Sequence, residues 1–374
     1  MGIGSVVGRG GFSLVELVSV VAMVAAVGAV LGPSVGGMRS QMRSVSSEGN
    51  LSAIGQVAGM YGADNQGAIF TFTWQPDVPY LNLRNGKMVS ADNEMLAGAF
   101  QVRDILHRAT GRLNGPDRIV PSIQRVMQRR YSHLVLADYM GGNVSSALWA
   151  DPADGQQLDW QANPLGYLND PSSVPYGEDY PSSGSGYDMS ANWDHPGMRM
   201  LWSFGSSYSV VPAGYLPDDR LSYGPLTSTP HLFENQSVGS QDLVVQRSMH
   251  EVAAPYGKVL MYEEFDREQE GSPYFAYDHA RPAKLMFDGS INTSESGKAR
   301  SSLSPEFFLE FVDRPSLYKK AFYNEWVQEY VPIHLFPREL EQDLDDGETG
   351  ELNMRYRWTG GGLGGLDYQP LLRR

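Results

Sequence analysis

The chain has 374 residues, 41% of them hydrophobic, and 20 tyrosines, which is enough apolar material for a packed core and excludes a disordered protein. Its formal net charge of −14 argues against nucleic acid as a partner, because phosphate binding needs a basic surface. The chain contains no cysteine, which excludes disulfides, thiol chemistry and cysteine-based zinc sites.

An uncharged segment lies close to the N-terminus, from Leu17 to Met38. As a helix rising about 1.5 Å per residue it would cover roughly 33 Å, the thickness of a bilayer core, and it has no polar face. Glu16 stands directly before it. A carboxylate at membrane depth costs on the order of 3 kcal/mol and usually marks a function or a partner. The segment therefore predicts a membrane-spanning helix that carries one functional acid.

The stretch Gly11-Phe12-Ser13-Leu14-Val15-Glu16 resembles the processing motif of type IV prepilins and type II secretion pseudopilins. The resemblance implies that a prepilin peptidase cuts after Gly11 and methylates the amino group of Phe12. It also implies that Glu16 pairs with the free amine of a neighbouring subunit during assembly, which neutralises two charges that are costly alone in lipid. Pro33 matches a proline that often kinks the helix of this family. An uncleaved signal anchor and a plain signal peptide are the alternatives.

The resemblance implies a chain of four segments. They are a leader over 1–11, a transmembrane and assembly helix over 12–38, the exposed half of the same helix over 39–62, and a globular head over 63–374. The implied fold class is α+β, a long N-terminal membrane-spanning helix packed on a globular antiparallel β-sheet head with large loop insertions. The implied location is the inner membrane, single-pass, with the head on the periplasmic side or in a surface fibre.

Partners follow from the same resemblance. They are the prepilin peptidase, other pilin or pseudopilin subunits, the inner-membrane assembly platform and membrane lipid, with no nucleic acid. No cofactor is expected. Calcium is the alternative, because a long acidic loop over 165–197 offers the oxygen ligands that this ion prefers, although their spacing matches no known calcium loop.

The helix is expected to continue beyond the uncharged segment. Leu51, Ile54, Ala58 and Tyr61 recur at helical spacing and predict one face packed on the head. Turn-forming residues over 62–67 end this helix, and the alternation over 69–74 predicts a strand. Periodicity predicts further helices over 93–111, 121–140 and 304–331, core strands over 202–215 and 259–264, and an acidic loop over 339–351.

A second resemblance lies in the C-terminal half. His279 followed by Asp288-Gly289 is similar to a His–Asp-Gly motif of pilin-like proteins from planctomycete-type bacteria, one residue short of its spacing. The residues themselves predict a strand over 283–287, a tight turn at Asp288-Gly289 in which both positions favour positive φ, and a return strand over 290–293. His279 either hydrogen-bonds a neighbouring strand or chelates a metal with Asp278. The glycine run over 360–365 either packs tightly or stays mobile.

Enzyme motifs are incomplete in this sequence. His250-Glu251-Val252-Ala253-Ala254 begins like a zincin helix but has alanine where the second histidine must stand, and no Gly-x-Ser-x-Gly elbow is present. The sequence therefore predicts a structural pilin-like subunit, not an enzyme, assembled into a type IV pilus-like fibre or a type II secretion pseudopilus. A membrane-tethered adhesin or cargo-binding module and an anchored enzyme are the alternatives.

Overall fold

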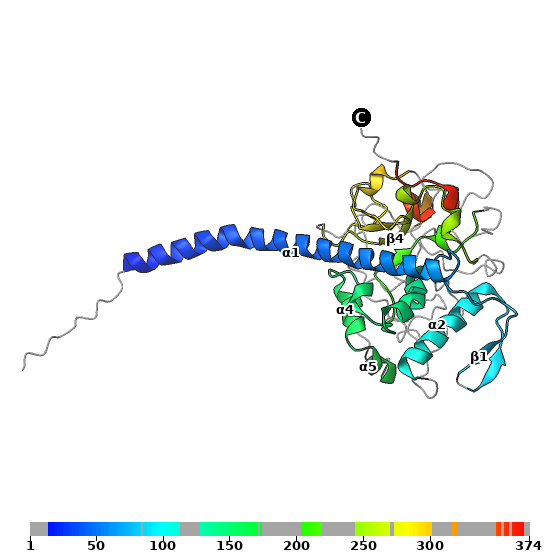
Figure 1. Cartoon of the computed structure of the whole chain (residues 1–374). Helices are drawn as coiled ribbons and strands as arrows, with labels where there is room; N and C mark the ends of the chain where they lie inside the picture. Colours follow the sequence, from blue (N-terminus) through cyan, green and yellow to red (C-terminus); the bar gives the residue numbers. More distant parts are fainter. Residues whose placement is uncertain are drawn as a thin grey trace, which may run out of the picture.

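The structure is a computed structural model. It describes residues 14–83, 85–112, 128–170, 173, 203–218, 244–269, 273–300, 316–319, 349–352, 355–358 and 361–369, and the side chains of the first helix from Gly37 onward. Figure 1 shows one long helix, α1 (Leu14–Asp64), that leaves a head formed around its C-terminal half.

The other α-helices of the described chain all belong to the head, and most are short. They are α2 (Glu94–Thr110), α3 (Gln128–Tyr131), α4 (Gly155–Ala162) and α5 (Pro164–Asn169). The longest 3₁₀ helix, η1 (Ser132–Met140), follows α3 directly. The remaining 3₁₀ turns are η2 (Ala147–Trp149), η5 (Pro212–Gly214), η7 (Met249–Glu251), η8 (Pro255–Gly257), η9 (Ser296–Lys298), η12 (Arg355–Trp358) and η13 (Gly362–Gly364).

A four-stranded antiparallel sheet with the order β3-β4-β5-β6 forms the centre of the head. Its strands are β3 (Tyr208–Val210), β4 (Val259–Glu263), β5 (Lys284–Met286) and β6 (Ile291–Asn292). Every residue of β4 is buried, as expected of a continuous apolar run. Two separate hairpins pair β1 (Tyr80–Asn82) with β2 (Lys87–Val89), and β7 (Ser316–Lys319) with β8 (Thr349–Leu352).

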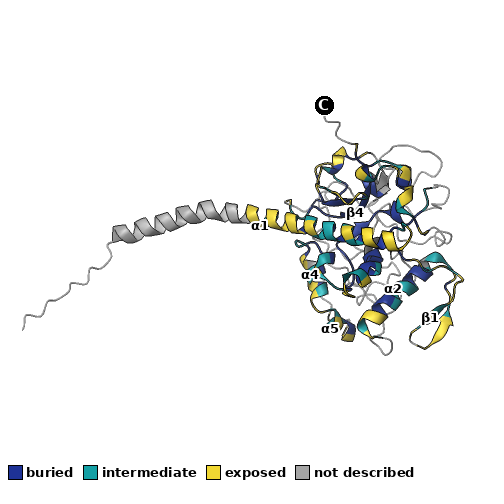
Figure 2. Cartoon of the chain, in the orientation of Figure 1, coloured by how far each residue is buried: buried dark blue, intermediate teal, exposed yellow. Residues whose placement is uncertain are grey.

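Helix α1 packs on this sheet through the face that the sequence predicts. Leu51, Ile54, Ala58 and Tyr61 are all buried in the main core. Burying one Leu or Ile side chain contributes roughly 1.5–3 kcal/mol, so this face alone is a large part of what holds α1 to the head. Gly55 allows the close approach, because a β-carbon added there would lie 2.8 Å from Cδ1 of Leu285 on β5. The opposite face of α1 is exposed (Figure 2).

A second apolar core lies beside the main one, on the α2 side of α1 (Figure 1). It joins α2 and η1 to Trp160 of α4 and Leu168 of α5. Helix α2, which lies within the predicted helix over 93–111, is capped at both ends. Asn93 accepts a hydrogen bond from the backbone of Leu96, and Gly111 takes the left-handed conformation at the C-cap.

The predicted fold class is wrong in two respects. Within the part of the chain that the structure describes, no helix combines the length and apolar character that crossing a membrane requires. From Gly37 to Asp64, helix α1 carries charged residues at Arg39, Arg43 and Glu48 and buries only one face on the head. In the described part of the head the sheets are small, with strands of two to five residues, and they stand beside helices and 3₁₀ turns.

Several predicted elements also differ from the structure. Residues 69–74 form no strand. Ile69 donates its N–H to the carbonyl of Arg247 at 2.9 Å, and the N–H groups of Thr73 and Trp74 donate to the side chain of Gln101. Of the predicted helix over 304–331, only 316–319 are described, and they form strand β7. Strand β8 likewise lies at the end of the predicted acidic loop. The predicted strands over 202–215 and 259–264 contain β3 and β4.

We predict that Gly55→Leu destabilises the head by about 1–3 kcal/mol, because the new side chain must displace Leu285 or lift α1 from the sheet. Gly59→Leu is the matched control, since nothing lies within 4 Å of a β-carbon at Gly59 and leucine favours a helix over glycine. Thermal unfolding of both variants measures the difference. Equal melting temperatures would contradict the close contact between α1 and β5.

Candidate functional site

The point where α1 enters the head is polar as well as buried. The hydroxyl oxygens of Ser47 on α1 and Tyr208 on β3 lie 2.9 Å apart, and Ser47 also donates a hydrogen bond to the carboxyl of Glu263 on β4. One turn further along α1, Asn50 donates to the carbonyl of Ala150 at 3.0 Å. A group of side chains from α1, β3 and β4 therefore fixes the rotation of the helix on the sheet. We call Ser47, Asn50, Tyr208 and Glu263 the polar clamp.

Glu263 is the titratable member of the polar clamp. Its second oxygen accepts the backbone N–H of Ala283 at 2.8 Å. Burial, reinforced by the charge of Asp151, raises the pKa of Glu263 to about 8, although its hydrogen bonds oppose the shift. On the neighbouring strand, burial lowers the pKa of Lys284 to about 7, and its ammonium donates to the carbonyls of Pro282 and Ser294 at 2.6 and 2.9 Å. A protonated Glu263 is the form that suits this buried position at neutral pH.

Next to the clamp, Arg267 holds two buried carboxylates together. Its guanidinium lies 2.8 Å from Asp154 and 3.5 Å from Asp151, and its side chain is only 3% exposed. Asp154 also accepts from the hydroxyl of Ser207 at 2.8 Å and caps α4 by accepting from the backbone of Gln157. Burial raises the pKa of Asp151, and the charge of Arg267 opposes that shift. Arg267 thus ties the start of α4 to the loop after β4.

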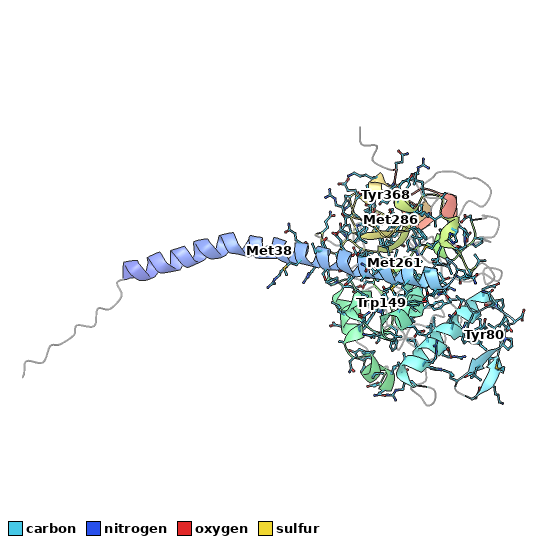
Figure 3. The ribbon with its side chains drawn as sticks, viewed as in Figure 1. Met38, Tyr80, Trp149, Met261, Met286 and Tyr368 are labelled. Atoms are coloured by element: carbon cyan, nitrogen blue, oxygen red, sulfur yellow. The ribbon has the colours of Figure 1, made fainter. Side chains whose placement is uncertain are left out.

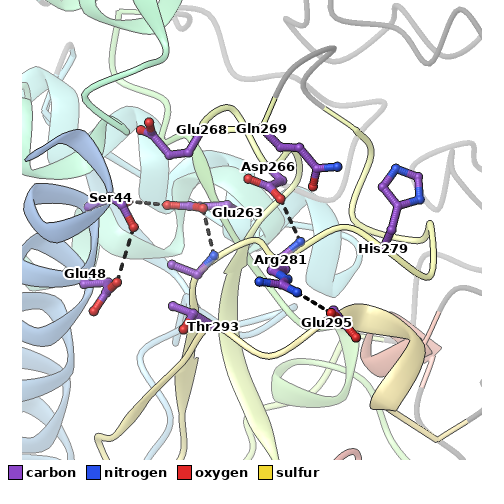
Figure 4. Close-up of a pocket in the computed structure, with 12 residues that line it drawn as sticks. Ser44, Glu48, Glu263, Asp266, Glu268, Gln269, His279, Arg281, Thr293 and Glu295 are labelled. Atoms are coloured by element: carbon purple, nitrogen blue, oxygen red, sulfur yellow. Dashed lines mark hydrogen bonds and ion pairs between the residues drawn. The ribbon is translucent and has the colours of Figure 1, made fainter. Parts of the chain in front are cut away.

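A cleft of about 580 Å³ opens beside the polar clamp, between α1 and the loops around β4 and β5 (Figure 4). Carboxylates predominate in its wall. Its lining residues are Ser44, Ser47, Glu48, Glu263, Asp266, Glu268, Gln269, His279, Arg281, Ala283, Thr293 and Glu295. Burial raises the pKa of Glu268, whereas hydrogen bonds from Arg281 and Lys298 lower the pKa of Glu295.

The negative charge of the cleft wall is partly neutralised by Arg281, which is itself part of the wall. Arg281 forms an ion pair with Glu295 and donates its backbone N–H to the carboxylate of Asp266 at 2.8 Å (Figure 4). No group of three or more His, Asp or Glu side chains among the described residues is arranged to hold a metal ion. The field of the remaining carboxylates favours positive charge in the cleft.

The predicted processing and assembly residues lie before Gly37, from which the structure describes side chains. Gly11 and Phe12 lie outside the described residues, and Glu16 and Pro33 lie on α1 before its side chains are described. Cleavage, methylation, charge pairing and the kink therefore stay predictions. The structure adds only that Leu14 to Asp64 form one continuous helix of 51 residues.

The motif residues of the C-terminal half lie in two places, the turn between β5 and β6 and the wall of the cleft. Asp288 and Gly289 form the turn between β5 and β6, where Asp288 accepts from Ser290 and Gly289 has a φ of 83°. Only the glycine has positive φ, so the prediction for both positions is wrong at Asp288. His279 stacks on Tyr277 with ring centres 5.7 Å apart and lines the cleft. Asp278 instead forms an ion pair with Arg355.

The sequence reasoning missed the polar clamp and the Arg267 cluster. The sequence contains an indication of each of them. Glu263 is an acid at the end of the apolar run Val259-Leu260-Met261-Tyr262, and a charge in a buried strand needs a partner. Asp151 and Asp154 stand close together around Pro152 in the sequence. Their common partner, Arg267, is distant in sequence, so no local pattern could reveal the contact.

Comparison of the chain with protein-family models, with curated proteins and with solved structures finds no match. The geometry of α1 and its seat on the head is therefore the basis for a functional proposal.

We predict that Glu263→Gln changes stability in a pH-dependent way. In the unfolded chain this carboxyl loses its proton near its ordinary pKa of 4.5, but in the fold only near 8. Between these pH values the unfolded state binds fewer protons, so native stability falls as the pH rises, on the order of 5 kcal/mol in all. Glutamine keeps the hydrogen bonds and removes the ionisation. The variant should match wild type near pH 4 and melt higher at pH 9. A constant difference across this range would contradict the buried acid.

We also predict that Arg267→Met destabilises the head by about 3–5 kcal/mol, because Asp151 and Asp154 would then be buried without a partner. Arg281→Met is the matched control. Its ion pair with Glu295 is exposed to solvent, so losing it should cost little stability. Urea unfolding of the two variants provides the measurement. Similar losses in both would show that the Arg267 cluster is not buried as described.

Proposed function

We propose that this protein is a pilin-like structural subunit, cut after Gly11 by a prepilin peptidase and assembled with other subunits through α1. The assembly is a type IV pilus-like fibre or a type II secretion pseudopilus. Two features support the proposal, namely the processing motif at the N-terminus and a continuous helix of 51 residues of which only the last part is seated on the head.

The observation that carries the proposal is an apolar line on the exposed part of α1. Met38, Met42 and Val45 are spaced at i, i+4 and i+7, so they lie on one face of the helix. They are 61%, 69% and 69% exposed, and Figure 3 places Met38 where α1 stands clear of the head. A helix normally buries such a face. We call these three residues the stalk line, and packing against another subunit would cover it.

The contact between α1 and the head suits a subunit that transmits mechanical force. The helix is held by apolar packing and by the polar clamp, and the clamp resists rotation as well as separation. A subunit joined to its neighbours through α1 transmits force to its head through this contact. The head can then vary without disturbing the part that assembles.

A second function is favoured by one feature of the head. The β1–β2 hairpin exposes Leu81 and Met88, and Val78 just before it is also exposed. Tyr80 of β1 stacks on Trp74 with ring centres 4.0 Å apart. An exposed apolar surface of this kind is typical of a binding module. An adhesin or cargo-binding head that uses the hairpin would keep its binding when assembly is blocked, which separates the two functions.

We predict that Met42→Lys abolishes assembly without lowering the melting temperature of the head, because the charge would have to be buried between subunits while Met42 is exposed in the single chain. Met42→Leu is the control, since it changes the side chain at the same position of α1 but keeps it apolar. Sedimentation of assemblies from the native cell, with immunodetection of the subunit, measures incorporation. Normal incorporation of Met42→Lys would contradict packing through the stalk line.

We further predict that Glu16→Ala leaves cleavage after Gly11 intact but reduces incorporation at least about tenfold, because the amine of the neighbouring Phe12 would lose its partner. Glu16→Gln separates charge from size and should fail similarly. The mass of the cut chain and the sedimented fraction report the two steps independently. If both variants assemble like wild type, the proposed charge pairing is wrong.

A further inference from the structure

The tail of the chain is attached to β4 through one fully buried ion pair. The ammonium nitrogen of Lys258 lies 3.5 Å from Oδ1 of Asp367, and the two side chains are 0% and 1% exposed. Lys258 directly precedes β4, and Asp367 follows η13 near the C-terminus. A pair of this kind gains little from its charges, because both were removed from water.

Asp367 is held in one position from several sides. Its backbone N–H donates to the carbonyl of Gly257 at 2.9 Å, and its carbonyl accepts from Arg300 at 2.8 Å. Its Oδ2 accepts the N–H of Val259 at 2.8 Å, which leaves Oδ1 to face the lysine. A side chain at Gly257 would collide with the tail, since a β-carbon there would lie 2.6 Å from the carbonyl oxygen of Tyr368. The reacting groups are therefore fixed in both position and orientation.

We propose that Lys258 and Asp367 form an intramolecular isopeptide bond in the mature protein. The lysine Nζ attacks Cγ of Asp367, and Oδ1 leaves as water. Of the three ammonium protons, two leave with that water and one stays on the amide nitrogen, so atoms and charges balance without an oxidant or a co-reactant. The bond fastens the tail covalently to the central sheet, and the proposal does not depend on the function proposed above.

The surroundings supply what this condensation needs. Proton transfer within the pair produces the neutral amine that can attack, and burial favours this form by lowering the pKa of Lys258. The N–H of Val259 already points at Oδ2, where negative charge develops as the amine adds to Cγ. Fixed neighbours at this distance correspond to a very high effective concentration. Asp218 and Arg247 also act on the lysine, in opposite directions: the charge of Asp218 raises its pKa and that of Arg247 lowers it.

The test is the intact mass of the full chain, purified without reduction or denaturation, followed by tandem mass spectrometry of a digest. The mass should fall one water below that of the sequence after known processing, and one branched peptide should join Lys258 to Asp367. The full mass would overturn the proposal outright. A succinimide at Asp288-Gly289 also loses one water, but it links no two peptides, and finding it alone would overturn the proposal as well.

Variants make the assignment specific. Lys258→Arg keeps the charge but cannot form this amide, so it should show no loss of mass and should unfold at a lower temperature. Asp367→Asn would lose ammonia in place of water and should therefore reach the same final mass as wild type. Lys298→Arg is the control at an exposed lysine paired with Glu295 and should keep the loss of water. Loss of water that persists in Lys258→Arg would rule out this bond.

Discussion

Helix α1 and the four-stranded sheet meet along a line of small and apolar side chains, and the rest of the head is built on that contact. Leu51, Ile54 and Ala58 are buried there, and Gly55 brings the helix close enough to touch Leu285. The sheet has strands of only two to five residues, so it would be marginal without the helix against it. Because α1 also extends away from the head, the same contact joins the folded domain to the part that is proposed to assemble.

Burying polar and charged groups at this contact costs free energy, but it also fixes the orientation of α1 on the sheet. A purely apolar interface would tolerate rotation of α1, since hydrophobic burial is not directional. The polar clamp removes that freedom, because Ser47 and Asn50 find their partners in only one setting of the helix. The buried acid Glu263 fits this role best when it is protonated. The charged Arg267 cluster beside it is tolerated because each of its carboxylates has a partner.

Local patterns in the sequence predicted the parts of the fold that depend on neighbours in the chain. The buried face of α1 follows from residue spacing, and helix α2 lies where the sequence predicts a helix over 93–111. The turn at Gly289 follows from its need for positive φ. Elsewhere the fold depends on contacts between residues that are distant in sequence, and local patterns do not predict such contacts. Residues 69–74 look like a strand, but Ile69 pairs with the chain near Arg247, and no pattern within the segment indicates that partner.

The candidate site was less predictable than the fold for the same reason. Asp151 is distant in sequence from Glu263 and Arg267, and these residues matter only because folding buries them together. His279 was singled out by its motif and does line the cleft, whereas Asp288 is confined to its turn. The membrane-spanning helix over 12–38 was predicted from its uncharged run and from the resemblance to prepilins, whereas no helix among the described residues has the length and apolar character to cross a membrane. The part of α1 with described side chains, from Gly37 onward, is charged and packed on the head.

The most direct measurement is the N-terminus of the mature protein, determined by mass spectrometry of the N-terminal peptide from the native cell. A pilin-like subunit begins at Phe12 with a methylated amino group, the product of cleavage after Gly11. That result would establish the processing on which assembly through α1 depends. A chain that begins at Met1, or one cut beyond Ala29, would contradict the account, and α1 would then be only a tether for the head.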